Sequence, residues 1–232
     1  MRFFRSASPR AVVIAVSSAA ILAAVTGCGG SGSSADPLAG MTAQQIYARS
    51  LDNLKAASSV HLTGSIVTFG GALTMNLTEG PGGCTGSLGA QGAGSVGVVG
   101  IGGKLWIKPD RQYLKSSGVS AALTNLLTGK YLSTTGKSAN LATLCGLSRV
   151  TSQLGSGSTF TKGTATTISG QRVLQIKATG QQGSEYVTNS ASPQVVRLDT
   201  GSGIMDFSDY NAPLTLTPPP ANLTVDGSKY GF

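Results

Sequence analysis

The sequence predicts an α+β domain built on a long antiparallel β-sheet. The prediction comes from a helical segment near residue 50, two groups of segments in which apolar and polar residues alternate, and further helical segments between these groups. Alternation with a period of two is typical of half-buried antiparallel strands, whereas apolar residues at spacings of three and four indicate a helix with one buried face. Strands that are grouped, rather than alternating singly with helices, are typical of the α+β class.

The first helix is predicted over residues 43–57. Thr42 and Gln45 have the spacing of a capping box, in which each side chain accepts a hydrogen bond from the backbone of the other residue. Tyr47 and Leu51 follow at helical spacing, so one face of this helix is expected to pack against a core.

The first group of strands follows this helix. A turn is expected at 69–71, and Pro109 is expected to end the last strand of the group. The richness in glycine over residues 80–103 predicts that the sheet bends there. The expected strands are 59–67, 73–78, 84–88, 95–101 and 104–108.

Two helices are expected between the strand groups. The first ends at Gly129 and has apolar residues on one face, and a second, over 141–154, would carry Cys145. The apolar residues of the first are Val119, Leu123, Leu126 and Leu127.

A second group of strands completes the fold. The dipeptide at 169–170 predicts a hairpin turn, and residues 191–193 predict another turn. We expect the domain to span residues 42–222, with prolines 218–220 close to its end and a C-terminal tail over 223–232. The expected strands are 160–168, 171–178, 185–188, 194–199 and 203–209.

The N-terminal residues have the order of a secretory signal peptide. Residues 1–10 contain three arginines and no acid, and residues 11–25 are an uninterrupted run of apolar and small residues. A membrane-spanning helix needs about 20 apolar residues, so this run is short for an uncleaved transmembrane anchor. A signal peptide of this kind is removed from the mature protein.

A cysteine follows the apolar run directly. Residues 25–28, V-T-G-C, resemble the lipobox of bacterial lipoproteins, in which an aliphatic residue and two small residues precede the cysteine that is acylated. The resemblance implies that residues 1–27 are cleaved off before Cys28. It also implies that Cys28 carries acyl chains such as palmitate and holds the mature protein on the extracytoplasmic face of the cell membrane. Two acyl chains give stable anchoring, whereas one is reversible. Residues 28–41 are then the lipidated cysteine and a flexible Gly/Ser tether.

Cys84 and Cys145 remain once Cys28 is lipidated. An even pair of cysteines in an oxidising compartment predicts a disulfide, which would close a loop of about 60 residues and stabilise the fold by roughly 4 kcal/mol. Two buried free thiols are the alternative. A zinc site is not expected, because the chain has no C-x-x-C motif and His61 is its only histidine.

The positive charge is moderate and dispersed. The net charge of +8 includes the three arginines of the signal peptide, and the lysines are scattered singly without a basic run. Nucleic acid is therefore not expected as a partner, and attraction to anionic lipid headgroups is the expected use of the excess charge.

No constellation of catalytic residues is evident. Residues 92–97, G-A-G-S-V-G, match the dinucleotide-binding fingerprint, but a predicted strand follows them where that fingerprint needs a helix. The chain has no G-x-S-x-G or S-x-x-K motif, and its glutamates, Glu79 and Glu185, lie far apart in sequence. We therefore expect neither an enzymatic activity nor a cofactor.

The remaining polar candidates have ordinary structural interpretations. His61, between Val60 and Leu62 at the start of a strand, is expected to point to the opposite face as a solvated or capping histidine without partners for catalysis. Asp206 and Asp209 are three residues apart and would face opposite sides of a regular strand, with hydrogen bonds to a turn as their expected role.

Four stretches of the chain carry a resemblance to a known family. They are GKLWIK at 103–108, TKGTATTISGQRVLQIKATG at 161–180, YVTNSASPQVVRLD at 186–199 and MDFSDYNAPLTLTPPP at 205–220. Together with the order of elements, they resemble the LolA-like bacterial lipoproteins of the mycobacterial LppX and LprAFG type over about residues 42–222. The resemblance implies a curved half-barrel sheet wrapped around a few helices, enclosing an apolar cavity that receives acyl chains of lipids or glycolipids.

The candidate cavity residues are apolar residues on the predicted strand faces. Any of them can instead belong to a packed core, and Trp106, flanked by Leu105 and Ile107, is more often a core residue than a ligand platform. The candidates are Leu62, Ile66, Leu73, Met75, Leu77, Val96, Val98, Trp106, Leu174, Ile176, Val196 and Leu198.

Two functions of different classes follow from these expectations. The first is a membrane-anchored carrier that takes acyl chains into a dry cavity, driven by burial of apolar surface at about 25 cal/mol per Å². The alternative is a non-catalytic envelope sensor or partner-binding lipoprotein with a filled interior and an envelope protein as partner. An apolar cavity of several hundred Å³ between sheet and helices would favour the carrier.

Overall fold

The structure is a computed structural model that describes residues 36–68, 71–134, 145, 147, 151, 159–180 and 182–232. Residues Asp36–Phe232 form one compact unit, and every helix and strand given below lies within it. None of the helices in these ranges has the length and apolar character needed to cross a membrane. The predicted signal peptide, Cys28 and the start of the tether lie outside the described residues.

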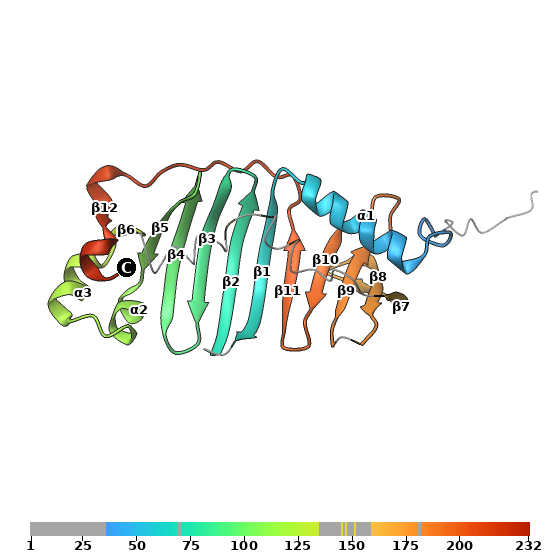
Figure 1. Ribbon diagram of the computed structural model, residues 1–232, viewed down its shortest axis with the longest axis horizontal. Helices are drawn as coiled ribbons and strands as arrows, with labels where there is room; N and C mark the ends of the chain where they lie inside the picture. Colours follow the sequence, from blue (N-terminus) through green and yellow to red (C-terminus); the bar gives the residue numbers. More distant parts are fainter. Residues whose placement is uncertain are drawn as a thin grey trace, which may run out of the picture. The chain divides into compact units, whose positions relative to one another are not determined.

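The described residues contain a 12-stranded sheet and three α-helices (Figure 1). The helices are α1 (Ala43–Ala56), α2 (Arg111–Ser116) and α3 (Ala121–Leu127), with two short 3₁₀ segments, η2 (Ala221–Leu223) and η3 (Gly227–Tyr230). The strands are β1 (Val60–Thr68), β2 (Gly71–Gly80), β3 (Gly83–Ala90), β4 (Gly94–Ile101), β5 (Lys104–Pro109), β6 (Tyr131–Ser133), β7 (Phe160–Ile168), β8 (Gln171–Ala178), β9 (Ser184–Thr188), β10 (Val195–Asp199), β11 (Gly203–Ser208) and β12 (Thr224–Asp226).

Two antiparallel meanders meet at the centre of the sheet. The strand order is β12-β6-β5-β4-β3-β2-β1-β11-β10-β9-β8-β7, and each described pair is antiparallel except β12 with β6. The meanders are joined where β1 pairs with β11, with Leu62 opposite Phe207 and Gly64 opposite Met205. The structure confirms the predicted α+β class and its large, curved antiparallel sheet (Figure 1).

The register places apolar side chains of neighbouring strands on one face of the sheet. Leu62 of β1 lies opposite Leu77 of β2, and Leu88 of β3 lies opposite Val96 of β4. Leu54 of α1 packs in one cluster with Leu62, and leucines of α2 and α3 pack in another with Val96. We call this face, against which the three helices pack, the covered face, and the opposite one the open face.

Helix α1 begins where its capping box predicts. Oγ1 of Thr42 accepts a hydrogen bond from the backbone N–H of Gln45 at 3.2 Å, and Oε1 of Gln45 accepts one from the N–H of Thr42 at 2.8 Å. The buried side chains of Ile46 and Tyr47 face the sheet, and Tyr47 stacks on Phe160 of β7 with ring centroids 3.9 Å apart. The apolar face of α1 therefore packs against the second meander.

The second meander follows the prediction closely. Strands β7 to β11 occupy the expected segments, and the β7–β8 turn has Ser169 at φ 49° and Gly170 at φ 80°. Two successive positive φ angles are typical of the type I′ turn, whose twist matches that of the flanking strands. The hairpin predicted from Ser-Gly is therefore confirmed.

The middle of the chain differs from the prediction. Neither α2 nor β6 was expected, because each is too short to display a period. The helix expected before Gly129 forms as α3, but Thr124 and Leu127 are its buried residues while Leu123 and Leu126 are exposed. Leu127 is buried as predicted and Val119 packs against the same core cluster, but the prediction is wrong for Leu123 and Leu126, since contacts with α2 and the sheet determine the buried side of so short a helix.

The folded chain also continues past residue 222, where the sequence predicted a tail. Residues 224–226 pair in parallel with β6, so β12 is an edge strand of the sheet. Tyr230 and Phe232 pack against the core cluster that contains Leu132 of β6. Prolines 218–220 therefore interrupt the regular structure without ending the domain.

We expect Gly64→Ala to destabilise the domain, because a Cβ at this position would overlap the carbonyl oxygen of Ile204 and lie 2.8 Å from Cα of Met205. Separating β1 from β11 to admit the methyl group is expected to lower the free energy of unfolding by about 2 kcal/mol. Gly40→Ala is the matched control, since a Cβ there meets nothing within 4 Å. Urea unfolding of both variants measures the difference, and equal stabilities would contradict this account of the β1–β11 junction.

Candidate functional site

The register places most of the predicted cavity residues on the covered face. Of these, Leu62, Leu77, Val96, Val98 and Ile176 are buried, whereas Ile66, Leu73, Met75, Leu174 and Leu198 are half-buried. Their common face follows from the strand pairings, which carry the same alternation from β8 to β4.

Two of the predicted residues are placed differently. Trp106 alternates with Leu105 and Ile107, which pack in the covered core, so its side chain belongs to the open face. Val196 is buried beside an irregularity in the β9–β10 pairing, between Val195 and Arg197. Alternation along β5 therefore gives the face of Trp106. It does not give the face of Val196, because the pairing of β10 is irregular there.

A row of half-buried apolar residues crosses β1 and β2 on the covered face. Ile66 lies opposite Leu73, and Gly64 lies opposite Met75. Leu73 and Met75 contact the edge of the core cluster under α2 and α3, and Ile66 belongs to none of the core clusters of the described residues. We call Ile66, Leu73 and Met75 the apolar row. The described helices leave these side chains partly uncovered.

The disulfide expected from the sequence is present between Cys84 and Cys145, whose Cα atoms are 5.2 Å apart. Cys84 is buried on the covered face, and Gly100 lies opposite it on β4, where a Cβ would come within 2.7 Å of Sγ of Cys145. The helix predicted over 141–154 lies outside the described residues apart from Cys145, Leu147 and Thr151. The bond therefore ties Cys145 to β3, next to Gly100 of β4.

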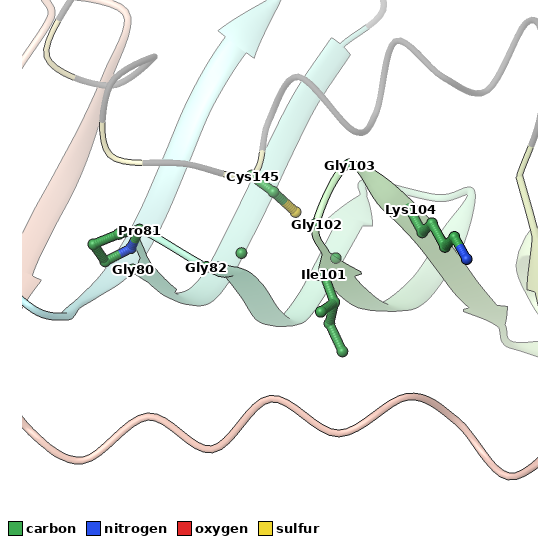
Figure 2. Close-up of a pocket in the computed structure, with 10 residues that line it drawn as sticks. Gly80, Pro81, Gly82, Ile101, Gly102, Gly103, Lys104 and Cys145 are labelled. Atoms are coloured by element: carbon green, nitrogen blue, oxygen red, sulfur yellow. The ribbon is translucent and has the colours of Figure 1, made fainter.

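A small hollow lies beside Cys145, between the β2–β3 and β4–β5 turns (Figure 2). Its volume is about 200 Å³, and glycines of the two turns make up most of its lining. Small-molecule sites are typically about 300–1,000 Å³ with apolar walls. This hollow is therefore too small and too polar to receive acyl chains.

Glu185 is a buried acid on the covered face, and the sequence predicted no role for it. Its side chain lies opposite Ile176 and Leu198, and only 4% of the residue is exposed. Ser50 of α1 donates a hydrogen bond to Oε1 at 2.7 Å, while Oε2 is buried without a hydrogen-bond partner in the described structure. In the sequence, Glu185 lies two residues before the apolar Val187, so the alternation of a strand would place both side chains on the same buried face.

Burial controls the protonation of this carboxyl. Loss of solvation raises the pKa of Glu185 to about 7, and the hydrogen bond from Ser50 lowers it in part. Burial, together with the nearby carboxylate, raises the pKa of Tyr47 to about 12 and also raises the pKa of Tyr210. Around pH 6 the carboxyl is therefore mostly neutral, and it then holds α1 to β9 through a hydrogen bond between neutral groups.

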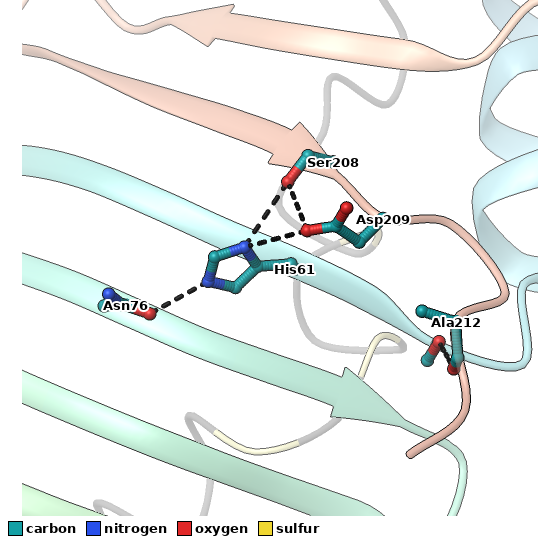
Figure 3. Close-up of polar contacts among 6 residues, drawn as sticks. His61, Asn76, Ser208, Asp209 and Ala212 are labelled. Carbon is teal, nitrogen blue, oxygen red and sulfur yellow. Dashed lines mark hydrogen bonds and ion pairs between the residues drawn. The ribbon is translucent and has the colours of Figure 1, made fainter.

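His61 points away from the buried side chains of Val60 and Leu62, as the sequence predicted, and on the open face it has polar partners that the sequence did not indicate (Figure 3). Nε2 lies 2.9 Å from Oδ1 of Asn76, and Nδ1 lies 3.3 Å from Oδ2 of Asp209 and 3.4 Å from Oγ of Ser208. A Ser-His-Asp relay needs the serine on one ring nitrogen and the acid on the other. Here both approach Nδ1, so the arrangement orders these side chains without activating Ser208 as a nucleophile.

The prediction that Asp206 and Asp209 face opposite sides of the sheet is wrong. Asp206 pairs with Arg197 on the open face, and Asp209 reaches His61 on the same face. Asp209 follows the last residue of β11 and has φ 50°, so the regular alternation no longer applies to it. The fingerprint-like residues 92–97 form a turn that runs into strand β4, as the sequence reasoning expected.

We expect the stability of the domain to fall as pH rises from about 4.5 to about 7 because of Glu185. Its folded-state pKa of about 7 exceeds the ordinary value of 4.5, so over this range the folded chain binds more protons than the unfolded chain. The loss at higher pH should amount to roughly 3 kcal/mol.

Glu185→Gln isolates this contribution, since the amide stays neutral and its oxygen can still accept from Ser50. The variant should gain stability relative to the parent chain as pH rises, and Ser50→Ala should move the transition of the parent chain to higher pH. Thermal unfolding across the pH range measures both effects. A constant difference between the parent chain and Glu185→Gln would contradict the assignment.

Comparisons with known proteins show a likeness of fold. No family model matches the sequence, and no curated protein sequence matches it. Among solved structures, the chain is similar to LprF from Mycobacterium bovis, with a TM-score of 0.52 and 16% identity over 77% of this chain and 97% of that chain. It is also similar to the Mycobacterium tuberculosis lipoprotein LppX, with a TM-score of 0.49 and 15% identity over 74% of this chain and 98% of that chain.

Identities this low establish the fold alone. The similarity to LprF covers nearly the whole of that chain, so the sheet and its helices correspond as one architecture. The chain thus has the same fold as LprF, in agreement with the LprAFG-type fold that the resemblance of its sequence stretches implied.

Proposed function

We propose that this protein is a membrane-anchored carrier that binds acyl chains of lipids or glycolipids on the covered face of its sheet. The observation that carries the proposal is the apolar row, Ile66, Leu73 and Met75, which remains half-buried on the face where the core otherwise lies. Covering such side chains with an acyl chain is favourable by about 25 cal/mol per Å² of apolar surface. The fold, which the sequence resemblance links to acyl-chain binding, supports the same function.

The proposed mechanism is transfer without covalent chemistry. An acyl chain leaves the bilayer and lies along the covered face, where the flanking core clusters exclude water from it. The lipid on Cys28 keeps the domain at the extracytoplasmic surface, so that the exchange occurs over a short distance. Burial of the chain supplies the driving free energy, and no bond is made or broken.

We expect Met75→Lys to weaken acyl-chain binding at least tenfold, because it places a charge in the apolar row, and a buried unpaired charge is costly. Thr74→Lys is the matched control, since Thr74 is the adjacent residue of β2 and its exposed side chain lies on the open face. Native mass spectrometry of residues 36–232, purified without detergent, and displacement of a fluorescent fatty acid measure binding.

Retention of lipid by Met75→Lys at the level of the control would contradict the location of the site. Recovery of bare protein from lipid-rich hosts, without displacement of the fluorescent probe, would contradict the carrier itself and favour the partner-binding alternative.

We expect Cys28→Ser to release the protein from the membrane fraction, because the substitution removes the thiol that would carry the lipid. Fractionation of cells that express the full chain measures the distribution, and the mass of the purified parent protein measures acylation. Ser33→Ala is the matched control, since it changes a residue of the predicted tether and leaves the thiol of Cys28 in place. Two results would contradict the anchoring. One is a Cys28→Ser protein that stays in the membrane fraction, and the other is a parent protein whose mass includes no acyl chains.

A further inference from the structure

A second hollow, distinct from the apolar row, lies on the open face of the sheet. Its volume is about 490 Å³, within the range typical of small-molecule sites. Segments that are far apart in the sequence converge on it: Thr63 of β1, Ser169 and Gln171 of the β7–β8 hairpin, residues 194–196, and residues 206–210. We call it the open-face hollow.

A polar cross-strand row forms one side of the open-face hollow. Thr63 lies opposite Asp206, and Asp206 lies opposite Arg197. The Arg197 guanidinium donates from Nε to Oδ1 of Asp206 at 2.5 Å and from Nη2 to Oδ2 at 2.9 Å. A bidentate pair of this kind holds the carboxylate in a set orientation and balances its charge. The hydrogen bond to Asp206 also raises the pKa of Arg197.

The His61 cluster borders the same hollow through Ser208 and Asp209, both of which line it (Figure 3). The Ser208 hydroxyl donates to Oδ2 of Asp209 at 3.1 Å, and that oxygen lies 3.3 Å from Nδ1 of His61. The cluster therefore presents a hydroxyl and a carboxylate whose positions are fixed by neighbours. Because Arg197 balances the charge of Asp206, Asp209 is the one acid among the described lining residues without a permanently charged partner, and the walls carry no large excess of either charge.

Other polar side chains of the lining are available to a ligand. Thr63, Ser169, Gln171 and Gln194 make no side-chain hydrogen bond within the part of the chain that the structure describes. Each amide offers two donors and one acceptor oxygen, and each hydroxyl can both donate and accept. Donors and acceptors are therefore interspersed around the hollow, next to the half-buried ring of Tyr210.

We propose that the open-face hollow binds a neutral carbohydrate. Closely spaced hydroxyl groups donate and accept at once, which suits walls of amides, hydroxyls and oriented carboxylates. A strongly anionic or cationic ligand would need an excess of the opposite charge, which the paired side chains do not offer. Tyr210 and Val196 provide apolar surface for the C–H groups of a sugar ring.

This site is separate from the proposed acyl-binding surface. Thr63 and Ser208 lie on the open face, whereas Met75 and Ile66 lie on the covered face. A sugar bound in the hollow therefore need not belong to the lipid bound on the other face, and a cell-envelope glycan fits the chemistry. Failure of either proposal leaves the other standing.

Titration of ¹⁵N-labelled residues 36–232 with maltose, trehalose, mannobiose and N-acetylglucosamine tests the proposal. We expect saturable NMR shifts from at least one saccharide, confined to residues that line the open-face hollow. The double variant Gln171→Ala/Gln194→Ala should weaken that binding at least tenfold, because it removes two amides without burying new groups. It should leave the displacement of the fluorescent fatty acid unchanged.

Gln182→Ala is the matched control, since Gln182 is exposed at the opposite end of β8, in the β8–β9 turn. The spectrum of each variant reports directly whether it is folded, and Thr63→Val offers a second change within the hollow. Absence of shifts with all four saccharides would overturn the proposal. So would shifts that the double variant retains, or stronger binding of a lysine-rich peptide or inositol hexakisphosphate at the same residues.

Discussion

The pairing of β1 with β11 is the constraint on which the rest of the structure depends. It joins two meanders whose other strands pair only within their own meander. It sets Leu62 opposite Phe207, while the pairing of β1 with β2 sets the same residue opposite Leu77. Because side chains alternate with a period of two, a slip of one residue here would turn the apolar face of one meander toward the polar face of the other. Gly64 and Gly203 lie at this junction, where a Cβ would collide with backbone of the facing strand. Glycine at these two positions thus lets the two meanders approach closely enough to form one continuous sheet.

The same register explains why Glu185 is an exception that the fold tolerates. An acid in phase with Ile176 and Val187 must lie beneath α1 if the apolar residues are to do so. Its raised pKa lets the carboxyl lose its charge instead of remaining buried as an unpaired anion, which would cost far more. Ser50 supplies a hydrogen bond from the helix, so the contact between α1 and β9 combines apolar packing with one polar anchor.

The sequence predicted the long elements well and the short elements poorly. Strands of five or more residues, such as β1 and β8, show alternation, and α1 shows both a capping box and an apolar face. The short elements α2, β6 and β12 have too few residues for a period, and they form because neighbouring strands provide their partners. The polar clusters were beyond reach for a different reason: His61 and Ser208 are 147 residues apart, so only the β1–β11 register brings them together.

The candidate acyl-binding surface also depends on how the core is divided. One cluster lies under α2 and α3, and two others lie under α1, so each half of the covered face is stabilised by its own helices. The apolar row lies between these clusters, with Leu73 and Met75 at the edge of the first and Ile66 outside all three. A ligand that covers the row adds contacts at this boundary without separating residues that already pack together. Lipid binding at this place would therefore require little disruption of the core, which is why a half-buried row is a better indication of a site than any fully buried side chain on the same strands.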